Sequence, residues 1–117
     1  MKAHYQYHFR PGYGSKHLLI EIFQGAERDE FIADFMSAIQ GIHPIFVGQM
    51  DLWMNDEILM EMDSEFGAFV ISKDIWGLAF ILADENQVVV YQMDALLLLD
   101  ARFEKVEVDF ERYRLKG

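Results

Sequence analysis

The stretch from Phe66 to Tyr91, FGAFVISKDIWGLAFILADENQVVVY, contains the three apolar runs that decide the fold. They are Ala68 to Ser72, Ile75 to Ala83 and Val88 to Tyr91, and short polar clusters separate them. Such clusters mark tight turns, so the stretch predicts two linked hairpins. Because the runs are nearly continuous rather than alternating, we expect both faces of these strands to be covered, in the middle of a sheet.

The composition places the chain among small globular proteins. With 117 residues, 52% of them hydrophobic and 15% aromatic, it is predicted to form a single domain over residues 1–117. There is no cysteine, so disulfides and thiol chemistry are excluded. The first twenty residues lack the apolar core of a signal peptide, and no apolar run reaches the roughly 18 residues of a membrane span. We therefore expect a cytoplasmic protein without a membrane segment.

The net charge is −10, from 20 acidic and 10 basic residues. A surface this negative repels the phosphate backbone of nucleic acids, so nucleic acid is not an expected partner. A basic protein is the partner that this charge favours.

The segments on either side of the central stretch add strands and helices. Apolar and polar residues alternate from Ala3 to Arg10, which predicts a strand with one wet face, and 17–23 reads as its hairpin partner. Residues 26–40 have helical spacing, and Gly41 is the expected stop. Residues 93–102 favour a short helix over a strand because of their leucines. Alternation over 106–110 predicts a last strand.

The predicted fold is therefore α+β. We expect an antiparallel sheet of about six or seven strands in mostly sequential order, one long helix packed on one face, and a short second helix.

The segment 49–63 supports a register argument. If Met50, Leu52 and Met54 share a face with Ile58, Met60 and Met62, the loop must be Asn55-Asp56-Glu57. Asn or Asp would supply the left-handed residue that such a loop needs. This register turns the methionines towards the core and the carboxylates outwards, with Asp51 opposite Glu61.

The predicted binding surface is the acidic, outward side of this hairpin and the turn that follows it. Six acids and no lysine or arginine occur between residues 49 and 72, and a tryptophan lies among them. Acids around an exposed aromatic side chain are typical of a surface that docks a basic protein. The alternative is a solvated outer face whose charge prevents aggregation of an edge strand. The predicted partner-binding residues are Asp51, Trp53, Asp56, Glu57, Glu61, Asp63 and Glu65.

No motif in the chain points to catalysis, a cofactor or a metal. The acids do not have the spacing of a calcium loop, and His4 and His8 are too far apart on a strand to hold one ion. Gly12 to Lys16 resembles a phosphate loop but lacks the strand-to-helix context that aims backbone N–H groups at an anion. We therefore predict no catalytic, cofactor-binding or metal-binding residues.

The function that these observations favour is a small acidic protein-binding domain, of inhibitor or immunity type, that masks a basic surface on a partner protein. The alternative is a small-molecule-binding or enzymatic domain with a pocket between helix and sheet. A homodimer joined through an edge strand is a third option. The lack of catalytic motifs favours binding over catalysis.

Overall fold

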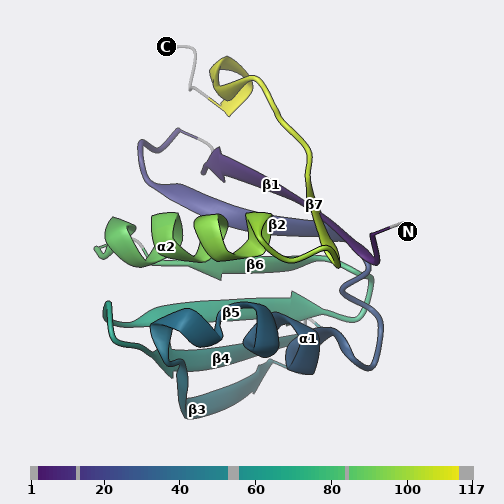
Figure 1. The fold of residues 1–117 in the computed structure, drawn as a ribbon, viewed down its shortest axis with the longest axis vertical. Coiled ribbons are helices and arrows are strands. Elements are labelled where there is room, and N and C mark those ends of the chain that lie inside the picture. The colour runs from purple at the N-terminus through teal and green to yellow at the C-terminus, as the bar shows by residue number, and fades with distance from the viewer. Residues whose placement is uncertain (1–2, 13, 53–55, 84, 114–117) are drawn as a thin grey trace.

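The computed structural model describes residues 3–12, 14–52, 56–83 and 85–113. In this part of the chain a seven-stranded sheet carries two α-helices on one face (Figure 1), which confirms the predicted α+β class. The strands are β1 (Tyr5–Pro11), β2 (Leu18–Gln24), β3 (Ile45–Leu52), β4 (Glu57–Asp63), β5 (Phe69–Asp74), β6 (Ala79–Leu82) and β7 (Phe103–Lys105). The helices are α1 (Phe31–Ala38) and α2 (Gln87–Leu98), with short 3-10 helices η1 (Gln40–Ile42) and η3 (Phe110–Tyr113).

The strand order is β3-β4-β5-β6-β2-β1-β7. Neighbouring strands are antiparallel except for β1 and β7, which are parallel. The expected sequential order is therefore right within the β1–β2 hairpin and the β3–β6 meander, and wrong where β6 pairs with β2. The chain leaves β2, passes through α1 and enters the sheet again at the far edge, so residues distant in sequence meet in the centre.

The core lies between the sheet and the two helices. Alternate residues of each strand face it: Tyr5, Tyr7 and Phe9 on β1 are buried in the core, while Gln6 and His8 between them are only partly covered. Strand alternation therefore predicted the inward side of β1 correctly. Residues from both helices and six of the strands form one buried cluster, which includes Ile20, Ile22, Phe31, Phe35, Met62, Phe69, Ile71, Ala79, Ile81, Val89, Met93, Leu97 and Phe103.

The first helix is shorter than the predicted span of 26–40. It begins at Phe31 because residues 25–30 form turns that bury Ala26 against the core. At its other end η1 follows, and the left-handed residue is His43 rather than Gly41. Gly41 has a different role, since a Cβ there would lie 3.1 Å from a methyl carbon of Leu96 on α2.

The second helix is the longer of the two. The run Val88 to Tyr91, predicted as a strand, is the first part of α2, which has 12 residues. Val89, Met93 and Leu97 are spaced by four residues and are buried together, so one helix spans the segment that the sequence interpretation divided. The predicted strand at 106–110 is also absent from the described residues, because the last strand is β7, three residues long, beside β1.

The register predicted for the acidic hairpin is wrong. Met50 pairs with Leu59 and Leu52 with Glu57, so Glu57 belongs to β4 and not to the predicted loop. Directly paired residues share a face, so Met50 lies on the face opposite to the core residues of β4, and Asp51 does not oppose Glu61. Both faces of β4 carry apolar residues, and the methionine pattern therefore could not select one register. The expected left-handed residue in the turn is Asp56, with φ 52°.

Candidate functional site

The face of the sheet opposite α1 and α2 carries the candidate site. On β4, β5 and β6 the residues that alternate with the core residues belong to this face, which we call the open face. Both helices lie on the other face (Figure 1). Leu59, Val70, Phe80 and Leu82 are only partly buried there. The expectation that helices or loops cover both faces of these central strands is therefore wrong. The apolar residues that suggested full burial instead form a partly exposed apolar floor.

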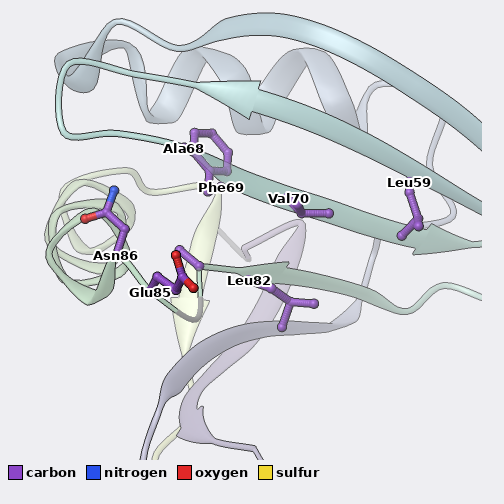
Figure 2. A pocket seen from close by; sticks show the side chains of 8 residues that line it. Leu59, Ala68, Phe69, Val70, Leu82, Glu85 and Asn86 are labelled. Carbon is purple, nitrogen blue, oxygen red and sulfur yellow. The ribbon is translucent and has the colours of Figure 1, made fainter.

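A hollow of about 620 Å³ lies on this floor. Its apolar lining includes Leu59, Val70 and Leu82, which come from three neighbouring strands (Figure 2). Glu85 and Asn86 directly precede the N-terminus of α2 and lie at the opposite side of the hollow from Leu59. The Nδ2 atom of Asn86 donates a hydrogen bond to the carbonyl oxygen of Phe66. The hollow is thus apolar at its base and polar at one end.

A second hollow, of about 220 Å³, continues along the same strands. Its lining is more polar: the hydroxyl of Ser72 donates a 2.5 Å hydrogen bond to a carboxylate oxygen of Glu57, and Asp74 lies opposite Glu57 across the strands. Phe80 forms an apolar part of the wall. The open face therefore changes from apolar to acidic over a few residues of strand.

Trp76 stands at the rim of the second hollow and is 77% exposed. It occupies the turn between β5 and β6, where the Asp74 carboxylate accepts hydrogen bonds from the backbone N–H groups of Trp76 and Leu78. The sequence interpretation singled out Trp53 and missed Trp76. The signal was present, since Asp74-Ile75-Trp76-Gly77 places a large aromatic residue in a turn, where core packing does not explain it.

The charge around these hollows has one sign. Lys73 is the only lysine or arginine between Arg28 and Arg102, a stretch that contains most of the chain's 20 acids. Lys73 pairs with Ala79 and Ile58, so it belongs to the helix-covered face. Within the described parts of β3 to β6, the open face therefore carries carboxylates and no basic side chain.

The structure places the predicted partner-binding residues in several positions. Glu57 and Glu61 lie on the open face, and Asp63 follows them on the same side of β4. Asp51 faces the other side, with Ile58, and Asp56 lies in the turn before β4. Glu65 lies beyond β4, where its carboxylate is 2.7 Å from Nδ1 of His43. Trp53 lies outside the described residues. The hairpin thus contributes part of its acids to the open face.

The other half of the open face contains a buried cation. Arg10 on β1 is 5% exposed and its Nε donates a 2.7 Å hydrogen bond to Glu21 on β2. Its guanidinium lies 4.5 Å from the ring centre of Tyr113 in η3 and 5.7 Å from that of Phe80. The carboxylate of Glu21 compensates the charge of Arg10 locally, so Arg10 does not offset the acids on β4.

Two hydrogen-bonded clusters lie on the helix side. Tyr5 donates to Asp34 on α1 (2.6 Å), and Arg102 donates to the same carboxylate (3.0 Å). Burial and the hydrogen bond to Asp34 raise the pKa of Tyr5 well above its usual value. The pKa of Asp100 is lowered by its hydrogen bonds from Arg102, whose own pKa is raised by Asp100.

The second cluster repeats this arrangement on α2. Tyr7 donates to Asp94 (2.9 Å), and Nζ of Lys105 lies 3.0 Å from the other carboxylate oxygen. Burial, followed by the hydrogen bond to Asp94, raises the pKa of Tyr7 far above its usual value. A tyrosine, an aspartate and a lysine together could transfer protons in catalysis. Tyr7, however, has no exposed surface through which it could contact a substrate. The cluster therefore fastens α2 to the sheet.

The histidines and acids of the described residues form no group that could hold a metal ion. His8 stacks on Phe23, and its Nδ1 lies 2.8 Å from the carbonyl oxygen of Val106. His43 is the left-handed residue beside Glu65. Among the helices of the described chain, none has the length and apolar character needed to cross a membrane.

Comparison with known proteins finds no match. No family model, no curated protein and no solved structure matches this chain.

Proposed function

We propose that this protein is a small acidic protein-binding domain, of inhibitor or immunity type, that masks a basic surface on a partner protein with its open face. The observation that carries the proposal is the apolar floor of Leu59, Val70 and Leu82, bordered by carboxylates, on a face where the described parts of β3 to β6 carry no basic side chain. Exposed apolar surface rimmed by polar residues is typical of an interaction site.

The two hollows would bind different side chains of the partner. The larger hollow would accept apolar side chains of the partner, whose burial adds to the affinity. The smaller hollow, with Glu57, Asp74 and Trp76, would accept a lysine or arginine, because a cation is attracted both to a carboxylate and to the face of an indole. A basic surface with interspersed apolar residues is the complement of this face.

The experiment uses the chain as bait in an extract of its own cells. We expect a basic protein to be retained at low salt and released as salt is raised, because screening weakens attraction between exposed charges. Reversing two exposed acids on β4, with Glu61→Lys and Asp63→Lys, should abolish retention. Truncation of the exposed indole, with Trp76→Ala, should weaken the isolated complex at least roughly tenfold.

Glu104→Lys is the matched control, because Glu104 is an exposed acid on β7, at the other end of the same sheet. This variant should retain the partner. If the double variant on β4 binds as the wild type does, or if the retained proteins stay bound at high salt, the proposal is wrong.

The alternative, a small-molecule-binding or enzymatic domain, is favoured by one observation. The volume of the larger hollow lies within the range of ligand sites in proteins. The position differs from the expected one, because this hollow lies on the open face and buried side chains of the core cluster lie between the helices and the sheet. Leu82→Trp would fill the hollow, so a small ligand should lose affinity for that variant while Glu61→Lys leaves its affinity unchanged.

A further inference from the structure

The two edges of the sheet differ in length and chemistry. β3 forms one edge and has eight residues, whereas β7 forms the other and has three, of which Glu104 and Lys105 are charged. Natural proteins protect edge strands by shortening them or by placing lysine, proline or other charges on them, because an unpaired edge can pair with another chain. β7 fits this description. Within β3, IFVGQMDL, the only charged residue is Asp51.

β3 also exposes large apolar side chains. The exposed fractions are 62% for Ile45, 53% for Phe46, 60% for Val47 and 57% for Met50. Four exposed large apolar residues on one strand are more than the scattered single exposure that is normal for a monomer. Phe46 pairs with Met62 and Met50 with Leu59, so these residues extend over both faces of this edge. None of these four residues belongs to the buried core cluster.

We propose that β3 pairs antiparallel with β3 of a second copy, so that the sheet continues across a two-fold axis. This inference is independent of the proposed function, since it uses an edge of the sheet and not its open face. The ladder with β4 is irregular between Phe46 and Gly48, but it is regular from Gly48 to Leu52. A second strand can therefore pair with a regular segment on the outer side of β3.

The sequence of β3 complements itself. When a strand pairs antiparallel with its own copy, Asp51 lies opposite Asp51 only if the two-fold axis passes through that residue. We place the axis beside Gln49, where Asp51 of each copy lies opposite the uncharged Val47 of the other. No pair of like charges then opposes the strand pairing, and Val47 and Met50 of both copies lie within the paired segment.

The area and the charge indicate a weak dimer. Each of the four side chains exposes roughly 100 Å², so two copies could bury at most roughly 800 Å² of side-chain surface besides the strand edges, which is below the size of stable specific interfaces. Two chains of net charge −10 also repel each other. Screening relieves this repulsion, so raising the salt concentration should strengthen the dimer, whereas it should weaken the complex with a basic partner.

The test is sedimentation equilibrium of the full chain over a range of concentrations, at roughly 50 mM and roughly 500 mM NaCl. We expect a reversible monomer–dimer equilibrium that shifts towards the dimer at the higher salt. Val47→Glu introduces a charge on the edge and should leave only monomer at both salt concentrations. Val88→Glu is the control, because Val88 is 56% exposed on α2, away from β3, and this variant should dimerise as the wild type does.

Cross-linking gives a second measurement that does not depend on a charge substitution. Because the chain has no cysteine, Met50→Cys provides a single thiol on β3, and a short bis-maleimide should link two copies of this variant but not two copies of Val88→Cys. Monomer at every concentration, a dimer that persists in Val47→Glu, or equal cross-linking of the two cysteine variants would overturn the proposal.

Discussion

Tyr5 and Tyr7 connect one strand to both helices. Each hydroxyl donates to an aspartate on a different helix, Asp34 on α1 and Asp94 on α2. Each aspartate also pairs with a cation from the segment after α2, Arg102 or Lys105. Burying a carboxylate is costly unless its charge is compensated, so each cluster is stable only while both donors are present.

Removing one donor should therefore be costly. We expect Tyr7→Phe to lower the free energy of unfolding by about 1.5–3 kcal/mol, the range for hydrogen bonds to charged groups. Urea denaturation gives this value. Tyr91→Phe is the control, because Tyr91 is an exposed residue of α2 and should change stability little. Equal effects of the two substitutions would show that the bond to Asp94 adds nothing to stability.

The tyrosine pKa values predict sensitivity to alkali. The pKa of Tyr7 is raised by burial and by Asp94, and that of Tyr5 by burial and by Asp34. In the unfolded chain a tyrosine ionises near pH 10. Above that pH the unfolded state loses protons that the folded state retains, so the stability present below pH 10 should fall as the pH rises towards the folded pKa values. Urea midpoints measured between about pH 9 and pH 11 should decrease, and the decrease should be smaller in Tyr7→Phe.

At the scale of the elements, local sequence patterns predict a strand correctly where one of its faces is exposed to solvent. The alternation of Tyr5, Tyr7 and Phe9 with polar residues predicted β1 and its buried side correctly. Val88 to Val90 favour strands by intrinsic propensity, yet they begin α2, because Val89 shares a buried helical stripe with Met93 and Leu97. Tertiary packing determines the secondary structure of this segment. A pattern in a short window of sequence does not contain this information.

The candidate site was predictable only in part, for a related reason. The acids on β4 were visible in the sequence, but which of them share a face depends on the pairing of β3 with β4. Apolar residues on both faces of these strands leave that register open. The apolar run of β5 and β6 predicts burial on both sides, and only the positions of the helices show that one side remains partly exposed.

The turn between β2 and α1 depends on a single glycine. Gly25 has φ +99°, and a Cβ there would lie 2.5 Å from the carbonyl oxygen of His4. Both the backbone conformation and this contact oppose any side chain. We expect Gly25→Ala to lower the free energy of unfolding by more than about 2 kcal/mol in urea denaturation.

Gly12→Ala is the matched control for this turn. A Cβ at Gly12 would have its nearest contact at 3.7 Å, an ordinary van der Waals distance. This substitution should change stability by less than about 1 kcal/mol. If both alanine variants were equally stable, the turn would not require the left-handed conformation.

At the scale of the whole molecule, the charge is distributed unevenly. The stretch between Arg28 and Arg102 has one lysine and most of the acids, and it supplies β3 to β6 and both helices. The exposed ion pairs of the described residues do not balance this excess, because exposed pairs contribute little. Repulsion among the acids therefore favours the unfolded chain, in which they are further apart.

This imbalance makes stability depend on salt in a definite direction. We expect the thermal unfolding midpoint to rise between roughly 10 mM and roughly 200 mM NaCl, because screening removes repulsion that acts mainly in the folded state. Reversing the charges of Glu61 and Asp63 should raise the midpoint at low salt and flatten its dependence on salt, since both side chains are exposed and lie among other acids. Calorimetry of the wild type and the double variant measures both effects. A midpoint that falls as salt is added would mean that attractive pairs, such as Arg102 with Asp34 and Lys105 with Asp94, outweigh the repulsion.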